Sequence, residues 1–328
     1  MNQFQYNKAK ESLSAIKLIA KDPNAHFLAG GTNLIDLMKM GIVTPSKLVD
    51  INHLPLSKIE KLPTTLRIGA LVTNSDLAEN EFIKSDFPLL SLAINAGASP
   101  QLRNMATVGG NLMQRTRCPY FFDTAMPCNK RVPGSGCGAL QGFNRMHAIF
   151  GASDQCIAVN PSDMNVAMRA LDAVVHVSGP RGERKINIAD FHRLPGNQPE
   201  LDNTLQKGEL ITAVDLPYAP FSKNVYYLKV RDRSSYAFAL VSVAAALHIE
   251  NNTIKEARLA MGGVAHKPWR LTAAEEFLKG KTVSEDNFKQ ASQIAMQGAK
   301  AYHYNQFKLK LAPNTIVQGL KMASGLAS

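Results

Sequence analysis

The chain has 328 residues, of which 45% are hydrophobic and 19% are charged, and its formal net charge is +11 at pH 7. This length predicts two or three domains with ample apolar material for a core, which excludes an intrinsically disordered chain. The basic residues are spread along the sequence and form no tail or aromatic-interleaved stripe, so nucleic-acid binding is not expected. The longest apolar run, residues 236–249, is too short to cross a bilayer, and no membrane insertion is expected.

The first 60 residues predict an α/β unit. Its first helix is expected to bury an apolar face that consists of Leu13, Ile16 and Ala20. The elements that follow are a strand, a Gly-Gly-Thr-Asn turn, a helix and a second strand, expected at 26–29, 30–33, 34–40 and 47–51.

A second unit is expected over residues 61–219. Its elements are a strand, a helix, a second glycine-rich turn and a closing strand, expected at 66–72, 88–96, 106–111 and 209–217. A helix is expected after Ser162 and Asp163, where Asp163 either caps the helix or reaches a ligand hydroxyl group. An irregular segment rich in Pro, Gly and Arg interrupts the unit at about 115–157.

Residues 220–328 follow a different pattern. Three strands are expected at 225–233, 237–250 and 253–264, and Asn251-Asn252 is typical of a hairpin turn between the last two. Helices are expected to close the chain at 271–280, 285–304 and 313–325. The class is therefore predicted to be α+β, with a domain boundary near 218–223 and without a doubly wound parallel sheet.

Two segments, 29–38 and 106–112, each place adjacent glycines before a Thr or Asn side chain. Glycine allows close approach of the backbone and positive φ, so that consecutive N–H groups can point at phosphate oxygens. The first segment also opens a helix, whose N-terminus favours anions. Neither segment is a G-x-G-x-x-G fingerprint or a Walker loop. The pair predicts either two tight turns or one diphosphate site.

All four cysteines, Cys118, Cys128, Cys137 and Cys156, fall within 39 residues, with the spacing C-x9-C-x8-C-x18-C. This spacing matches neither a zinc ribbon nor a bacterial ferredoxin. Thiolates that converge from a loop indicate a metal or iron–sulfur site, because a bound metal can order such a segment. Two disulfides or four plain thiols are the alternatives, although disulfide frameworks belong mainly to small secreted domains.

Basic residues are densest beside the first two cysteines, at Arg115, Arg117, Lys130 and Arg131. Three interpretations follow from their charge. They form a solvated loop, a docking surface for a partner, or a counter-charge for an anionic cluster.

The chain resembles, over nearly its whole length, the FAD-binding medium subunits of the xanthine dehydrogenase and molybdenum hydroxylase family. The resemblance is carried by FLAGGTNLIDLM, GASPQLRNMATVGGNL, NPSDMNVAMRALDA, KVRDRSSYAFALVSVAAAL and MGGVAHKPWR. The cysteine segment resembles the subgroup whose flavin subunit holds an additional 4Fe–4S cluster, above all bacterial periplasmic-type aldehyde oxidoreductases, and also 4-hydroxybenzoyl-CoA reductase.

This resemblance implies a two-part FAD-binding domain of the vanillyl-alcohol-oxidase and CO-dehydrogenase-flavoprotein type. Its parts are 1–60 and 61–219, with the 4Fe–4S insertion at about 115–157, and a CO-dehydrogenase-flavoprotein-like domain of antiparallel sheet and helices follows at 220–328. The implied FAD contacts are Leu28, Ala29, Gly30, Gly31, Thr32, Asn33, Leu34, Gly97, Ala98, Thr107, Gly109, Gly110, Asn111, Asp163 and Lys229. The implied cluster ligands are Cys118, Cys128, Cys137 and Cys156.

The resemblance further implies an oxidoreductase subunit that carries FAD and a 4Fe–4S cluster in a heterotrimer. A molybdopterin-binding large subunit oxidises the substrate, a small subunit carries 2Fe–2S clusters, and this chain passes electrons to an external acceptor. No acid–base catalyst is expected in the chain itself. Leu240 stands where NAD-reducing members place a lysine, so O2, a quinone or a protein is the expected acceptor.

Three alternatives remain open. The chain is the FAD subunit of another molybdenum hydroxylase, a non-flavin protein with a structural zinc at the four cysteines, or a free-standing FAD oxidase. The N-terminus contains no secretory signal, which predicts folding in the cytoplasm. A periplasmic location would require co-export with a partner subunit that carries a twin-arginine signal.

Overall fold

In the computed structural model, which describes residues 1–326, the N-terminal unit is a three-stranded parallel sheet with the order β1-β3-β2. Its elements are β1 (Gln5–Lys8), α1 (Ser12–Lys21), β2 (Ala25–Leu28), α2 (Leu34–Lys39) and β3 (Lys47–Asp50). Helix α1 buries Ala15, Ile16 and Ile19 in the core of this unit. The expected helix face is wrong at Leu13 and Ala20, which are exposed, because the sheet meets the side that Ala15 and Ile19 occupy.

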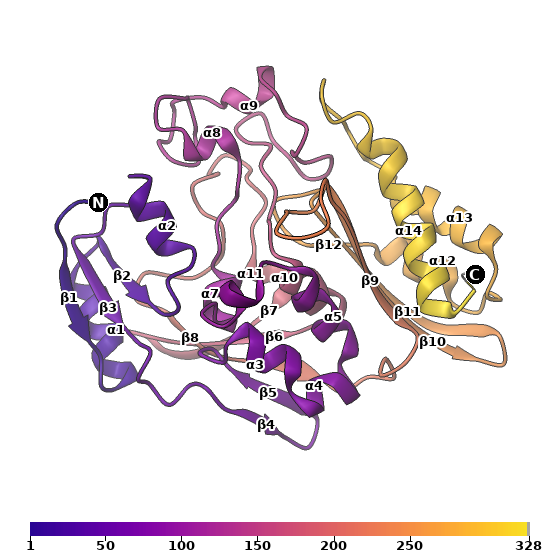
Figure 1. Cartoon of the computed structure of the whole chain (residues 1–328), viewed down its shortest axis with the longest axis horizontal. Helices are drawn as coiled ribbons and strands as arrows, with labels where there is room; N and C mark the ends of the chain where they lie inside the picture. The colour runs from indigo at the N-terminus through magenta and orange to yellow at the C-terminus, as the bar shows by residue number, and fades with distance from the viewer. Residues whose placement is uncertain (327–328) are drawn as a thin grey trace.

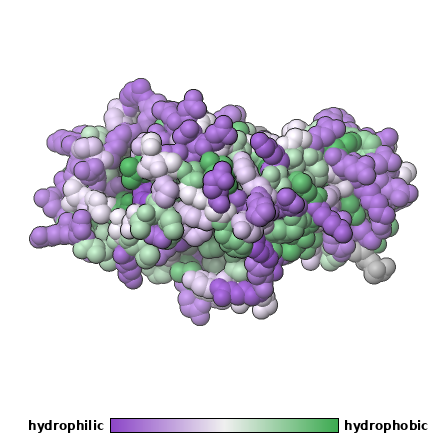
Figure 2. Space-filling model, turned by 90° about the horizontal axis from the view of Figure 1, so that it is seen from above, coloured by the Kyte–Doolittle hydropathy of each residue, from purple (hydrophilic) through white to green (hydrophobic). Residues whose placement is uncertain are grey.

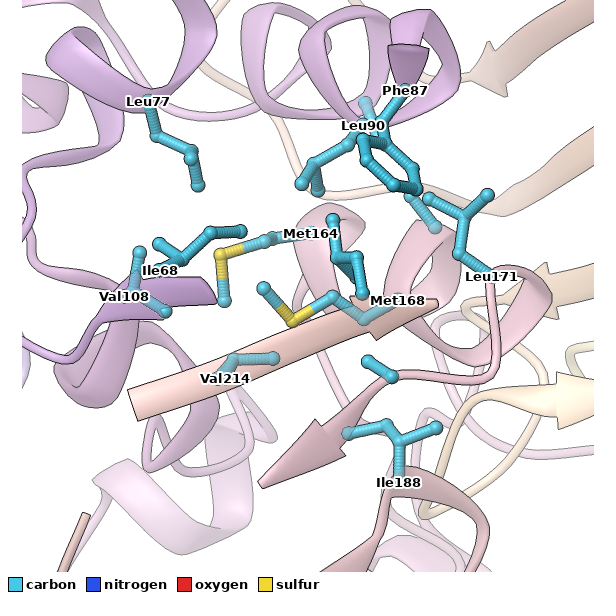
Figure 3. Packing of buried hydrophobic residues seen from close by; sticks show 14 of the residues in the cluster. Ile68, Leu77, Phe87, Leu90, Val108, Met164, Met168, Leu171, Ile188 and Val214 are labelled. Atoms are coloured by element: carbon cyan, nitrogen blue, oxygen red, sulfur yellow. The ribbon is translucent and has the colours of Figure 1, made fainter. Parts of the chain in front are cut away.

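The second unit is a five-stranded antiparallel sheet with the order β4-β5-β8-β6-β7. Its strands are β4 (Ile59–Lys61), β5 (Thr65–Gly69), β6 (Val174–Gly179), β7 (Gly182–Asn187) and β8 (Leu210–Pro217). The helices of this unit are α3 (Asn74–Glu79), α4 (Glu81–Asp86), α5 (Pro88–Ala96), α6 (Pro100–Arg103), α7 (Val108–Leu112), α10 (Asp163–Ala170) and α11 (Ile188–Phe191). Its core lies between sheet and helices, where Ile68 and Val214 face Leu77, Val108 and Met164 (Figure 3).

The C-terminal unit is a four-stranded antiparallel sheet with the order β12-β11-β10-β9. Its strands are β9 (Val225–Val230), β10 (Val241–Glu250), β11 (Thr253–Gly262) and β12 (Trp269–Arg270). Along β10, Val243 and Ala245 enter the core beneath the C-terminal helices, whereas Ala244 and Ala246 enter the core of the second unit. Both faces of β10 are therefore buried, which explains its continuous apolar sequence.

Three helices cover the outer face of this sheet: α12 (Thr272–Leu278), α13 (Glu285–Ala295) and α14 (Lys308–Ser324) (Figure 1). The Asn251-Asn252 hairpin is confirmed, since both residues have positive φ, of 47° and 60°. The helix expected over 285–304 ends at Ala295, because Gly298 adopts a φ of 79° and turns the chain. The last helix begins at Lys308 and contains Pro313, whereas a start at 313 was expected.

The cysteine segment contains only short helices, α8 (Pro119–Phe122) and α9 (Gly138–Gln141), and it stands above the sheets in Figure 1. Figure 2 views the molecule from this side and shows hydrophilic residues mainly around the edges, with paler and hydrophobic residues between them. Over residues 1–326, no helix is both long and apolar enough to cross a membrane. The α+β class and the antiparallel C-terminal sheet with its helices are confirmed.

Candidate functional site

Two segments distant in sequence line one cavity of about 520 Å³, here called the glycine cavity. Its lining includes Ala29, Gly30, Gly31, Thr32, Asn33, Leu34, Thr107, Gly109 and Gly110. The two segments approach so closely that a Cβ atom on Gly30 would lie 1.7 Å from the carbonyl oxygen of Met105. Only glycine fits at position 30, because a side chain there would collide with backbone atoms.

The first glycine segment carries hydrogen-bond donors that the protein does not use. The backbone N–H groups of Gly30, Gly31 and Thr32 donate to no acceptor within residues 1–326. Asn33 accepts a bond from the backbone N–H of Arg115 at 3.0 Å, but its buried side-chain nitrogen has no partner. A buried donor without an acceptor costs about 1–3 kcal/mol, and an anionic group in the cavity would remove that cost. These residues fit a diphosphate.

The second glycine segment is not the expected turn. Residues 108–112 form the short helix α7, because the Thr107 hydroxyl caps it by accepting the N–H of Gly110 at 3.2 Å. The N–H of Gly109 donates to the carbonyl oxygen of Ala70 at 2.8 Å. Both glycine N–H groups are thus occupied, so this segment supplies space for a ligand and the first segment supplies the donors.

Six of the expected FAD contacts do not line the glycine cavity: Leu28, Gly97, Ala98, Asn111, Asp163 and Lys229. Leu28 ends β2, and Gly97 and Ala98 follow α5, with Ala98 at a φ of 51°. Asp163 instead lines a second cavity of about 190 Å³, here called the Phe238 cavity. The Phe238 cavity is also lined by Thr116, Arg117, Cys118, Met146, His147, Asn160, Ser162, Ser242 and Gly263.

A hydrogen bond joins the walls of the two cavities. Asn111 of α7 accepts a bond from the Ser162 hydroxyl at 2.7 Å. Ser162 lines the Phe238 cavity, and Gly110, the neighbour of Asn111, lines the glycine cavity. Helices α7 and α10 therefore stand between the two cavities, and an extended ligand that runs across their contact would reach both.

A buried polar network supports the Phe238 cavity. The Asp163 carboxylate accepts hydrogen bonds from Tyr227 and from Lys229, each at 2.7 Å. Lys229 also donates to the carbonyl oxygen of Ala96 at 3.1 Å, and the Ser242 hydroxyl lies 3.0 Å from the Tyr227 oxygen. Burial and the neighbouring Asp163 charge raise the pKa of Tyr227. The helix cap is Ser162, which accepts the Asn165 N–H at 3.0 Å, so Asp163 is free for this network.

The four cysteines line one further cavity, here called the cysteine cavity and defined by Cys118, Cys128, Cys137 and Cys156. All four are free thiols, so the alternative of two disulfides is wrong. Cys128 and Cys137 pair as an antiparallel bridge, which brings the middle of the segment together. Thr116 and Cys118 line both this cavity and the Phe238 cavity, so the two share a wall.

The thiols differ in acidity. Burial raises the pKa of Cys118 to about 12, whereas a hydrogen bond from Cys156 lowers the pKa of Cys137. Burial together with that same bond raises the pKa of Cys156. Among the described residues, no group of three or more His, Cys, Asp or Glu side chains is arranged to hold a single metal ion. What the structure does bring together is the four thiols, in the lining of one cavity.

The basic residues beside the cysteines brace the segment internally, so neither a solvated loop nor an open docking surface describes them. Asp202 pairs with Arg115 and with Lys130, each at 2.6 Å, and the Lys130 side chain is only 2% exposed. Arg117 pairs with Asp36 at 2.6 Å, and Arg131 donates to backbone carbonyl groups of α8. Burial opposes ionisation of Asp202, but Arg115 and Lys130 hold its pKa below the usual value.

Two histidines that the sequence did not single out contact cysteine sulfur atoms. His147 Nε2 lies 3.1 Å from the Cys118 sulfur, and His266 Nε2 lies 3.2 Å from the Cys156 sulfur. His266 sits inside the segment MGGVAHKPWR, so its place in that motif was the available signal. His147 precedes a buried Ala-Ile-Phe run, which gives no comparable signal.

Comparison with known proteins adds to this geometry. Residues 2–219 match the family of the FAD binding domain in molybdopterin dehydrogenase, and residues 226–317 match the CO dehydrogenase flavoprotein C-terminal domain. The chain is 50% identical over 331 residues to the aldehyde oxidoreductase FAD-binding subunit PaoB of Escherichia coli, and the alignment covers 100% of each chain. It is 30% identical to the glyceraldehyde dehydrogenase medium chain of Sulfolobus acidocaldarius, covering 90% of this chain and 88% of the relative.

Similarity of structure extends across the whole fold. A chain of carbon monoxide dehydrogenase from Oligotropha carboxidovorans superposes with a TM-score of 0.78 and 24% identity, covering 99% of each chain. At that identity the likeness concerns the fold alone. It includes the antiparallel C-terminal sheet and the helices that cover it.

Proposed function

The chain belongs to the FAD-binding medium subunits of the xanthine dehydrogenase and carbon monoxide dehydrogenase family, and on this premise we propose that it is the electron-transferring FAD subunit of a molybdenum-containing aldehyde oxidoreductase. The aldehyde class is supported by full-length identity of 50% to a subunit named for that activity. The glycine cavity, with its unused N–H donors, is the observation that carries the FAD-binding part.

We assign the FAD diphosphate to the first glycine segment. The N–H groups of Gly30, Gly31 and Thr32 and the side-chain nitrogen of Asn33 are its available donors. The remaining length of the dinucleotide would cross the contact between α7 and α10 and bring its ring to the Phe238 cavity. A bound flavin supplies hydride and single-electron chemistry, and the protein sets its potential and access.

The Phe238 cavity suits the flavin end because its supporting network is rigid. Asp163 is held from two sides, by Tyr227 and Lys229, and its remaining lone pairs can accept from a ribityl hydroxyl group. Gly97 leaves room beside it, since a Cβ atom there would lie 3.1 Å from the Asp163 carboxylate. We therefore propose that Asp163, Lys229 and Gly97 contact or support the bound FAD at the wall of the Phe238 cavity.

We further propose that Cys118, Cys128, Cys137 and Cys156 ligate a 4Fe–4S cluster. Four free thiols that line one cavity in a braced loop supply its donor set. A zinc ion would need all four sulfurs about 2.3 Å from one point. Among the described residues no group of three or more His, Cys, Asp or Glu side chains could hold a single metal ion, which argues against zinc. A cluster binds each thiolate through a different iron and accepts a wider arrangement.

The partners follow from the same family. We propose a heterotrimer in which a molybdopterin subunit oxidises the aldehyde and a 2Fe–2S subunit delivers electrons to this chain, which passes them to an external acceptor. The units 1–60, 61–219 and 220–328 would act as two FAD-binding parts and a C-terminal domain. Leu240, which is only 6% exposed, offers no charge to a pyridine nucleotide and supports an acceptor of another class.

The test compares the chain alone with the chain co-expressed with its two candidate partners. Aldehyde-dependent reduction of a dye by the assembly, absent from the chain alone, is the expected result, with FAD released on denaturation. Turnover by the isolated chain would indicate a free-standing oxidase. A colourless chain that retains zinc would contradict the proposal, and activity on a heterocycle instead of an aldehyde would place the assembly in another class of molybdenum hydroxylase.

A further inference from the structure

The imidazole rings of His147, inside the cysteine segment, and His266, in the C-terminal unit, each contact one of the four cysteines. Their Nε2 atoms lie 3.1 Å from the sulfur of Cys118 and 3.2 Å from that of Cys156. Both side chains are buried, with exposed fractions of 2% and 9% for the two residues. Because His266 follows β11 of the C-terminal unit, a residue outside the insertion also contacts a cysteine of the insertion.

The second ring nitrogen of each histidine decides where its proton lies. The Nδ1 atoms of His147 and His266 are buried and have no hydrogen-bond partner. A neutral imidazole ring carries its one N–H on either Nδ1 or Nε2. A proton on Nδ1 would be buried without an acceptor, whereas a proton on Nε2 faces a sulfur. The Nε2–H tautomer is therefore favoured in both rings.

The backbone of His147 is held by Lys308, the first residue of α14, and by Asn305 in the turn before it. Its carbonyl oxygen accepts from Lys308 at 2.9 Å and from Asn305 at 3.1 Å, and both donors are fully buried. Lys308 also donates to the carbonyl oxygen of Gly263 at 2.7 Å, three residues before His266. One buried ammonium group thus fixes the backbone near both histidines, which gives their rings a set orientation.

We propose that His147 and His266 are positioning residues that donate Nε2–H···Sγ hydrogen bonds to Cys118 and Cys156, and that these bonds raise the reduction potential of the cluster. This inference rests on the cluster that we proposed above. A hydrogen bond to a ligand sulfur stabilises the more negative, reduced form more than the oxidised form, so the potential rises. The tuning is asymmetric, because the histidines contact two of the four ligands.

The experiment uses the complete assembly, with wild-type chain and the variants His147→Leu, His147→Gln, His266→Leu and His266→Gln. EPR-monitored redox titration measures the midpoint potential of the cluster, and chemical analysis measures iron and FAD. We expect each Leu variant to keep its iron and FAD and to show a more negative cluster potential. Gln carries an N–H at nearly the same reach as Nε2, so the Gln variants should keep most of the wild-type potential. His248→Leu, on β10, is the control and should leave the potential unchanged.

Two results would overturn the inference. Leu variants with full iron and an unshifted potential would leave the histidines a packing role only. Loss of iron from the Leu variants, together with strong nitrogen coupling in the wild-type EPR signal, would make the histidines ligands and not donors. If the Leu variants fail to assemble, His147→Asn replaces them, because the shorter Asn withdraws its N–H from the sulfur and should lower the potential. A wild-type assembly with no iron beyond that of its 2Fe–2S subunit would instead refute the proposed cluster, and the inference with it.

Discussion

The ammonium group of Lys229 lies 2.7 Å from the carboxylate of Asp163, and their side chains are only 4% and 9% exposed. Lys229 comes from β9 of the C-terminal unit, and Asp163 opens α10 of the second unit. This pair therefore ties two units together directly beneath the Phe238 cavity. Removal of one partner leaves the other charge buried and uncompensated.

The ion pair between Lys229 and Asp163 predicts a loss of stability in a single variant that a double variant should partly restore. Lys229→Met should lower the free energy of unfolding by about 3–5 kcal/mol, because the Asp163 carboxylate would lose its ion-pair partner. Asp163→Asn combined with Lys229→Met should recover part of this loss, since no buried charge remains. Urea denaturation followed by circular dichroism measures both. A double variant as unstable as the sum of the two single variants would contradict the pairing.

The glycine cavity predicts that Gly110→Val expels FAD without unfolding the chain. A Cβ atom at position 110 meets only the Thr107 hydroxyl, at 3.0 Å, and the further carbon atoms would enter the cavity. FAD content should fall to a small fraction of the wild-type value, while the circular dichroism spectrum stays the same. The control is Gly319→Ala in α14, where the added Cβ would lie 3.5 Å from Val243 and helix propensity favours alanine by about 1 kcal/mol. Full FAD content in Gly110→Val would refute the assignment.

The brace at Asp202 predicts a local effect on the cysteine segment. Asp202→Asn removes the charge that pairs with Arg115 and with the nearly inaccessible Lys130, at a cost of about 3–5 kcal/mol. Hydrogen exchange should speed up at residues 116–157, while the C-terminal sheet keeps its protection. Glu285→Gln, whose ion pairs with Lys289 and Lys321 lie on the surface, is the matched control and should leave exchange in the segment unaltered. Equal exchange in the two variants would argue against the brace.

The buried His192 predicts a loss of stability in acid. Burial lowers its pKa to about 4, whereas the unfolded chain should titrate near 6.5. Between these pH values the unfolded chain binds the proton more strongly than the folded chain. The contribution of His192 to the free energy of unfolding is therefore complete above pH 6.5 and falls by on the order of 3 kcal/mol as the pH drops to 4. His192→Gln should flatten the decline of unfolding free energy with falling pH. An unchanged slope would show that other groups cause the acid transition.

Much of this arrangement could be predicted from local sequence. The apolar run around β10 predicted a buried strand, because both of its faces enter cores and no polar alternation is needed. The Gly-Gly pairs were compatible with two tight turns or with one shared site, and both segments do line one cavity. The helicity of α7 could not be predicted, since two glycines disfavour a helix and the cap at Thr107 with the contact to Ala70 decides the outcome.

The features that were missed depend on contacts between distant residues. Lys130 and Asp202 are 72 positions apart, so no local pattern excluded an exposed basic surface. His266 lies 110 positions from Cys156, and only the packing of the C-terminal unit against the insertion brings them together. Leu13 was assigned to the wrong face because an apolar residue at helical spacing does not reveal which side the sheet covers.

The central claim is that one chain holds FAD in the glycine cavity and an iron–sulfur cluster on the four cysteines as two separate sites. The most direct measurement is the content of FAD, iron and acid-labile sulfide per chain in the anaerobically purified assembly, compared with Gly110→Val and Cys128→Ser. Beyond the iron of the 2Fe–2S subunit, we predict FAD and about four iron atoms in the wild type, loss of FAD alone in Gly110→Val, and loss of those four iron atoms alone in Cys128→Ser. A wild-type chain without flavin and sulfide, or a Cys128→Ser chain with its iron intact, would contradict it.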